Sequence, residues 1–266
     1  MIPEKIRILF LSTVLFAFPS MGTVITDFTE ATLDSNIQLD VPNPVGNVTF
    51  DAGADELRLT TTANTDMWTA RNNAPIAWTS RPVVGAGESW YAETFIRYNG
   101  AANGGQRVAG ITLYPGPDGT GGSTQGMDFS LGLNDWNDRG VELQGWGSTD
   151  IGDSTLTFIS ATANNESSAH LRLQVTENGA TDAFVAYWKA NDVDPWIQFA
   201  SFNSGVDSSR VGLFLKTGPI LTYPTDASVS FDYFNVAAIP EPSAFGLFGL
   251  GGLALIGAAR RHRRSK

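Results

Sequence analysis

Apolar and polar residues alternate with a period of two through most of residues 23–236. In the run 171–175, for example, three apolar residues are separated by Arg172 and Gln174. Runs of this kind predict strands with one buried face, and segments rich in Gly, Asn, Asp and Pro separate them as turns. Further runs with this alternation are 48–50, 57–59, 127–133, 211–215 and 229–233. We therefore expect an all-β fold, an antiparallel two-sheet sandwich or jelly roll of about twelve short strands, over residues 23–236.

The first 22 residues have a different pattern. Lys5 and Arg7 precede an apolar stretch at 8–18, and the small residues Ser20 and Gly22 follow it. This order is typical of a secretory signal peptide, here residues 1–22. An uncleaved N-terminal anchor is the alternative.

Residues 237–266 form a second terminal segment. Pro240, Glu241 and Pro242 interrupt any strand or helix, because proline fixes φ and lacks a donor. Residues 244–259 carry no charge, which predicts a short hydrophobic transmembrane helix near the lower end of the roughly 17–25 residues that span a bilayer. Arg260 and Arg261 begin a basic cluster expected to stay on the cytoplasmic side. A buried C-terminal helix is the alternative, but a surface helix should have a polar face.

Pro-Glu-Pro-Ser at 240–243, the apolar stretch and the arginine cluster resemble the PEP-CTERM sorting signal of exosortase substrates. The resemblance implies an exosortase-type processing protease as partner and a transient inner-membrane anchor that is cut near Pro240–Pro242. It also implies that the product reaches the cell surface or extracellular matrix.

The charge of the chain is −10, and it becomes more negative when both terminal segments are set aside. Without them, Lys and Arg fall from 17 to 10 and Asp and Glu from 27 to 25, which gives about −15. A strongly acidic protein is not expected to bind nucleic acid, which needs cationic surface. The chain has no cysteine, so disulfides and thiolate metal sites are excluded.

The body also resembles a concanavalin A-like lectin/glucanase domain of the kind appended to β-xylosidases. The resemblance lies in the order of short patterns along nearly the whole body. They include Leu-Arg-Leu at 57–59, Glu-Thr-Phe at 93–95, Leu-Arg-Leu-Gln-Val at 171–175 and Ser-Phe-Asp-Tyr-Phe-Asn-Val at 230–236. It implies a two-sheet sandwich and, in many members, carbohydrate as the ligand.

Catalytic chemistry has few candidates, and we name no catalytic residue. The body contains one histidine, His170, expected to be a solvated residue on the polar side of a strand, so a multi-histidine zinc site is excluded. Hydrolytic members of the resembled superfamily carry Glu-x-Asp-x-(x-)Glu on one strand. Here Glu142 is followed by Gln144 and Trp146 instead, which favours a non-catalytic domain.

The same stretch suggests carbohydrate binding. In a strand, Glu142, Gln144 and Trp146 share the face opposite Val141, Leu143 and Gly145. An indole beside a carboxylate and an amide complements the apolar face and the hydroxyl groups of a sugar, and Trp136 adds a second ring. The alternative is that Trp146 lies between the sheets. Five other tryptophans are assigned to the core or its rim: Trp68, Trp78, Trp90, Trp188 and Trp196.

No cofactor is required by this interpretation. Hard oxygen donors are abundant, so a structural Ca²⁺ is a further hypothesis, with Asp51, Asp232 and the turn 134–138 as candidate ligands. The sequence favours an exported matrix protein that binds an extracellular polysaccharide. A secreted polysaccharide-degrading enzyme and a purely structural matrix protein are the alternatives.

Overall fold

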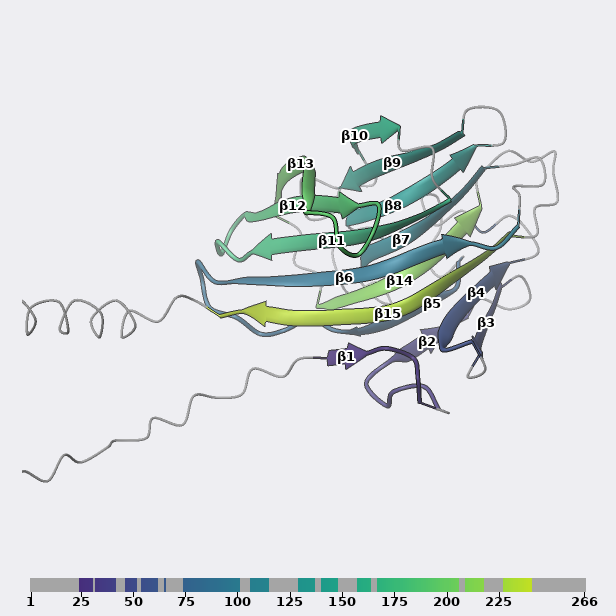
Figure 1. The fold of residues 1–266 in the computed structure, drawn as a ribbon. Coiled ribbons are helices and arrows are strands. Elements are labelled where there is room, and N and C mark those ends of the chain that lie inside the picture. The colour runs from purple at the N-terminus through teal and green to yellow at the C-terminus, as the bar shows by residue number, and fades with distance from the viewer. Residues whose placement is uncertain are drawn as a thin grey trace, which may run out of the picture.

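The computed structural model describes residues 24–30, 32–41, 46–51, 54–61, 65, 74–100, 106–114, 129–136, 140–147, 157–163, 167–205, 209–217 and 227–240. Within these ranges the chain forms fifteen strands and no helix, arranged as two antiparallel sheets (Figure 1). The predicted all-β sandwich is confirmed. The predicted signal peptide (1–22) and C-terminal helix (244–259) lie outside the described residues. Within the described part, no helix long and apolar enough to cross a membrane is present.

The first sheet, sheet A, has eight strands in the order β13-β12-β11-β6-β15-β4-β3, and β1 pairs with β15 beside this path. Its strands are β1 (Val24–Thr26), β3 (Gly46–Asp51), β4 (Glu56–Thr61), β6 (Ser89–Tyr98), β11 (Ser168–Thr176), β12 (Asp182–Lys189), β13 (Ile197–Ser204) and β15 (Ala227–Ile239). All the predicted alternating runs at 48–50, 57–59, 171–175 and 229–233 fall in this sheet.

The second sheet, sheet B, has seven strands in the order β10-β9-β8-β7-β14-β5-β2. Its strands are β2 (Gln38–Asp40), β5 (Ile76–Ser80), β7 (Gln106–Tyr114), β8 (Phe129–Trp136), β9 (Gly140–Gly147), β10 (Thr157–Ala163) and β14 (Arg210–Thr217). The strand count exceeds the twelve expected partly because β1 and β2 have only three residues each, too few to show an alternation.

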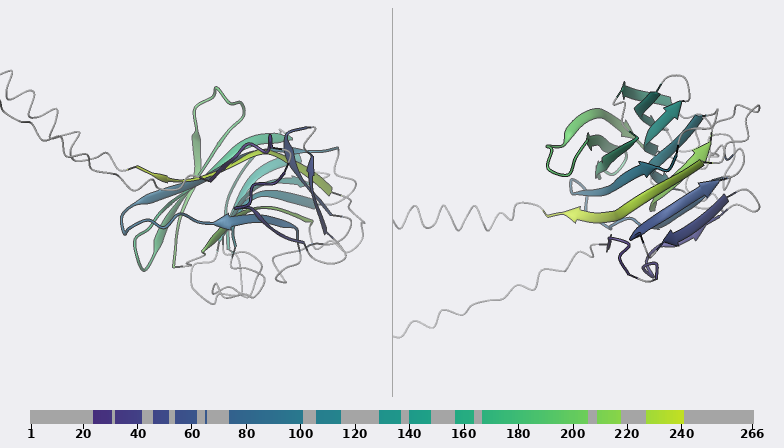
Figure 2. Two further views of the ribbon diagram at one scale, coloured as in Figure 1. Left: turned by 90° about the horizontal axis from the view of Figure 1, so that it is seen from below. Right: turned by 45° about the vertical axis from the view of Figure 1, so that its right-hand side comes forward.

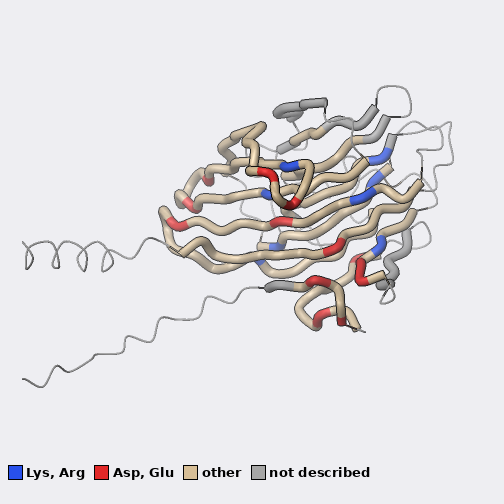
Figure 3. Tube along the Cα trace, in the orientation of Figure 1, with Lys and Arg blue, Asp and Glu red and all other residues tan. Residues whose placement is uncertain are grey.

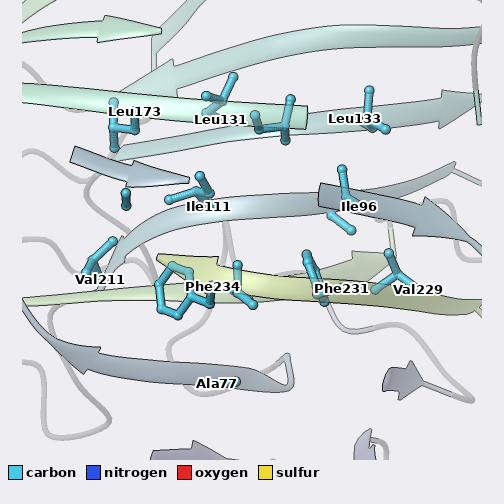
Figure 4. Close-up of a cluster of buried hydrophobic side chains, with 14 of the residues drawn as sticks. Ala77, Ile96, Ile111, Leu131, Leu133, Leu173, Val211, Val229, Phe231 and Phe234 are labelled. Atoms are coloured by element: carbon cyan, nitrogen blue, oxygen red, sulfur yellow. The ribbon is translucent and has the colours of Figure 1, made fainter. Parts of the chain in front are cut away.

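The core lies between the two sheets and is built from the apolar half of each alternation. Ile96 and Phe231 of sheet A and Ile111, Leu131 and Val211 of sheet B are all fully buried there (Figure 4). Burying each such side chain contributes about 1.5–3 kcal/mol. The polar half of each alternation lies on the opposite side of its own sheet. We call these the outer face of sheet A and the outer face of sheet B.

The last strand, β15, extends further than the sequence suggested. We expected the sandwich to end at residue 236, but Ala238 and Ile239 pair with Trp90 and Ser89 of β6. The strand stops at the residue before Pro240, where proline removes the next donor. Because β1 pairs with residues 234–236 of β15, the first and last strands of the sandwich lie side by side (Figure 2).

Candidate functional site

The predicted carbohydrate-binding residues lie on two neighbouring strands of sheet B. Leu143 of β9 is fully buried in the core, as the alternation predicted. Positions 142, 144 and 146 therefore fall on the outer face of sheet B, and we call them the Trp146 row. Trp136 is the last residue of β8, which pairs with β9. Of these four residues only Gln144 has a described side chain.

Gln144 is only 6% exposed, so it is not the open surface amide that the sequence suggested. Its Oε1 accepts a hydrogen bond from Nδ2 of Asn134 on β8, with 2.5 Å between the two atoms. Asn134 is itself fully buried. This hydrogen bond fixes the orientation of the Gln144 amide, because it determines which side of the amide carries the oxygen and which the NH₂ group. Whether Gln144 contacts a ligand stays a prediction.

Two glycines, Gly132 and Gly110, lie beside Gln144 in sheet B, and both are buried. In register, Gln144 pairs with Gly132 of β8, and Gly132 pairs with Gly110 of β7. A Cβ atom on Gly110 would lie 2.1 Å from the carbonyl oxygen of Leu131, so the close approach of these strands requires glycine. Along β8, Gly132 lies between Ser130 and Asn134 on the same face of the sheet.

Ser130 lies in the register position next to Trp146. Its side chain is fully buried, and its hydroxyl has no hydrogen-bond partner within the described structure. The neighbouring hydroxyl of Thr112 instead donates to the carbonyl oxygen of Phe129 at 3.0 Å. A buried hydroxyl without a partner costs about 1–3 kcal/mol. Ser130 therefore has unused hydrogen-bonding capacity beside the Trp146 row.

His170 is buried, although the sequence predicted a solvated residue. It lies on the outer face of sheet A, as expected, but it is only 7% exposed. Its Nδ1 is 3.1 Å from the hydroxyl of Tyr233, and its ring centroid is 4.6 Å from that of Phe95. Burial and the neighbouring Lys189 ammonium hold the pKa of His170 below its ordinary value.

Trp196 was also placed wrongly. We assigned it to the core or its rim, but its ring covers Arg172 on the outer face of sheet A, with 4.2 Å from the guanidinium carbon to the ring centroid. The turn after β12 places it there, and Lys189 Nζ holds this turn by donating to the backbone oxygen and Oδ1 of Asp192. Trp90 and Trp188, in contrast, belong to the core or pack against it. Trp68 lies outside the described residues.

The hypothesis of a structural calcium ion stays a prediction. Asp232 lies in the irregular part of the pairing between β15 and β6, Asp51 is the last residue of β3, and residues 137–138 lie outside the described residues. No group of three or more His, Asp or Glu side chains suited to a metal ion occurs within the described ranges.

The predicted sorting residues begin where the sandwich ends. Pro240 is exposed and directly follows β15. Glu241, Pro242, Arg260 and Arg261 lie outside the described residues. Residues 238–264 match the family model of the PEP-CTERM protein-sorting motif, which confirms the resemblance seen in the sequence. The motif overlaps the last two residues of β15.

Solved structures with a similar fold are numerous, although their sequences are remote. A bifunctional GH43-CE protein of Bacteroides eggerthii is 16% identical with a TM-score of 0.59; the match covers 82% of this chain and 26% of that one. A GH43 glycoside hydrolase engineered to display both endo-xylanase and exo-arabinofuranosidase activity is 12% identical with a TM-score of 0.56, over 85% of this chain and 42% of that one. This chain therefore spans less than half of either protein.

A functionally unknown protein from Saccharomyces cerevisiae has a TM-score of 0.52 at 13% identity, and the match covers 78% of this chain and 98% of that one. No curated protein matches the sequence. At these identities the similarity establishes the fold alone, the two-sheet sandwich that the sequence predicted. The chain thus joins a sandwich of this kind to a PEP-CTERM protein-sorting motif, which indicates an exported surface protein.

Proposed function

We propose that this protein is an exported cell-surface or extracellular-matrix protein whose sandwich binds polysaccharide without cleaving it. A signal peptide (1–22) is removed on export, residues 23–236 with the end of β15 form the binding domain, and residues 237–266 hold the precursor in the inner membrane. An exosortase then cuts near Pro240–Pro242.

The binding part of this proposal rests on the polar side chains of Ser130 and Gln144, which lie along the Trp146 row. Ser130, in register with Trp146, has a buried hydroxyl with no partner in the described structure. Two residues along β9, Gln144 accepts a hydrogen bond from Asn134 and pairs with Gly132. Amides and hydroxyls recognise the hydroxyl groups of a sugar.

The resembling structures add modest support. Two of them carry the name of a glycoside hydrolase family, and one is described as displaying endo-xylanase and exo-arabinofuranosidase activity. A sandwich of this fold therefore occurs in proteins of a glycoside hydrolase family. The match covers only part of each of those chains, so their activities are not transferred to this one.

The residues of β9 favour binding without cleavage. Glycoside hydrolysis needs two carboxyl groups about 5–10 Å apart. On β9 only Glu142 of the outward positions is acidic, and Gln144 and Trp146 occupy the next two. These three residues can bind a sugar, but β9 lacks the second carboxyl group that hydrolysis of a glycosidic bond requires.

A comparison of variants on a panel of polysaccharides tests the proposal. The full chain is kept in solution with a detergent that has no sugar headgroup, and its migration is measured in native gels containing each polysaccharide. At least one polysaccharide should retard the wild type, and Trp146→Ala should weaken this retardation about tenfold in apparent affinity. No new reducing ends should appear during incubation.

The control is Trp188→Phe, which changes a tryptophan packed against the core and should bind like the wild type. Release of reducing ends would replace the binding proposal with an enzymatic one. If no polysaccharide retards the wild type, the sandwich has a structural role and the binding proposal is wrong.

A further inference from the structure

The outer face of sheet A carries aromatic and polar side chains that the Trp146 row does not use. They lie on three adjacent strands and on the turn between β12 and β13, which crosses in front of β11 in Figure 1. We call them the sheet A patch, which consists of Tyr91 and Glu93 (β6), Arg172 and Gln174 (β11), Asn235 (β15) and Trp196 (turn). Cross-strand register brings them together: Arg172 and Asn235 both pair with Glu93, and Gln174 pairs with Tyr91.

An ion pair forms the centre of the patch. Nε and a terminal nitrogen of Arg172 both donate to Oε2 of Glu93, at 2.7 and 2.5 Å. The side chains are 30% and 15% exposed, so both stay within reach of solvent. Figure 3 shows the charges of both signs that lie along these strands. Because the two charges neutralise each other, the centre should favour an uncharged ligand over a polyanion.

Two aromatic rings flank this centre. The guanidinium carbon of Arg172 lies 5.0 Å from the ring centroid of Tyr91 and 4.2 Å from that of Trp196. Cation–π contacts hold both rings in place, and both side chains are half-buried, so part of each ring stays accessible. Rigid, partly exposed rings beside polar groups suit the apolar face of a sugar ring.

Asn235 has hydrogen-bonding capacity that the fold does not use. Its Nδ2 donates to the hydroxyl of Tyr91 at 3.1 Å and to Oε1 of Glu93 at 3.2 Å. This fixes which way the amide points, because a reversed amide would set its oxygen against the Glu93 carboxylate. Its Oδ1 is then buried with no partner in the part of the chain described. A buried acceptor without a protein donor calls for an explanation, and a ligand hydroxyl at the edge of the patch would supply the donor.

From these contacts we infer that the sheet A patch is a second binding site, for an uncharged polysaccharide. The inference rests on the proposed function, since it assumes that the exported sandwich meets a polysaccharide. The patch and the Trp146 row lie on opposite sides of the two-layer sandwich. One domain then binds two polysaccharide chains and links them together.

The experiment uses the full chain in the same sugar-free detergent. Native gels with neutral or uronate-bearing polysaccharides measure affinity, and light scattering of mixtures measures cross-linking. Trp196→Ala and Asn235→Ala alter the patch, Trp146→Ala alters the other face, and Val193→Ala is the matched control. Val193 is 93% exposed on the same turn as Trp196 and lies outside the patch. Circular dichroism and the unfolding midpoint check that each variant is folded.

We expect Trp196→Ala and Asn235→Ala to keep binding through the Trp146 row but to scatter at least about tenfold less light at matched concentration. Adding Trp146→Ala to either should abolish retardation by neutral polysaccharide. Val193→Ala should behave like the wild type.

The failures of the two proposals are distinguishable. If Trp146→Ala alone abolishes binding and the patch variants cross-link like the wild type, the second site is wrong and the proposed function stands. If only the patch variants lose binding, the Trp146 row is wrong and the patch is the binding face. Stronger patch-dependent binding of uronate polymers would overturn the assignment to an uncharged ligand.

Discussion

The ring of Trp196 covers the guanidinium group of Arg172, although 24 residues of sequence separate them along β11, β12 and the turn that follows. The contact ties a hairpin at the edge of sheet A to the middle of that sheet. It also gives a half-buried tryptophan a fixed position on the outer face.

Removing this ring should loosen the hairpin. We expect Trp196→Ala to lower the free energy of unfolding by about 1 kcal/mol, because a partly exposed cation–π contact contributes about that much. Urea denaturation followed by circular dichroism measures the change. Val193→Ala should differ from the wild type by less than about 0.5 kcal/mol, and an equal loss in both variants would contradict the account.

His170 should make stability depend on pH. Burial, and then the Lys189 ammonium, lower its pKa, while Asp192, Glu93 and Asp194 partly oppose the shift. As the pH falls through about 6.5, the unfolded chain binds a proton before the folded chain does, so stability is lost on acidification and is complete at higher pH.

Unfolding midpoints at about pH 7.5 and pH 5.5 measure this effect. His170→Gln keeps a polar partner for Tyr233 but cannot titrate, so its midpoint should fall less between the two conditions than that of the wild type. Equal falls in both proteins would show that His170 is not the titrating group.

The contact between β7 and β8 should tolerate no side chain at Gly110. A Cβ there would lie 2.1 Å from the carbonyl oxygen of Leu131 and 2.6 Å from Cα of Gly132, so Gly110→Ala forces two backbones apart. We expect a loss of about 1–3 kcal/mol or more in unfolding free energy. At Gly85 the nearest atom is the flexible Glu88 carboxylate at 3.2 Å, so Gly85→Ala should be nearly neutral.

The sorting motif can be tested in cells that process it. Glu241→Ala, or deletion of residues 260–266, should leave the protein as a precursor in the inner membrane. The first variant removes a residue that the exosortase should recognise, and the second removes the basic cluster that fixes the orientation of the tail in the membrane. Fractionation and immunoblotting measure the distribution, with Glu30→Ala on the exposed body as control. Unchanged release of both variants would rule the mechanism out.

The alternation of residues predicted the sandwich and the side of each strand that faces the core. Leu143 and Leu171 are buried as expected, because one residue of register decides the face of a whole strand. The same pattern says nothing about what lies over the opposite face. His170 was therefore expected in solvent, whereas Phe95 and Tyr233 cover its ring.

The sheet A patch was missed for a related reason. Tyr91 and Asn235 lie 144 residues apart in the sequence and meet through the hydrogen bond between their side chains, and Trp196 reaches the sheet from a turn. Pairing between distant strands creates such a cluster, and no local pattern reports it. One local signal pointed to the patch: Tyr91 and Glu93 occupy outward positions of the same strand. A strand whose outer face meets only solvent does not need an aromatic residue at such a position.

Migration of the full chain in native gels that contain polysaccharide decides whether the sandwich binds polysaccharide. At least one polysaccharide should slow the wild type, and Trp146→Ala combined with Trp196→Ala should restore free migration. Free migration of the wild type in every gel, or retardation that survives both substitutions, would contradict this prediction.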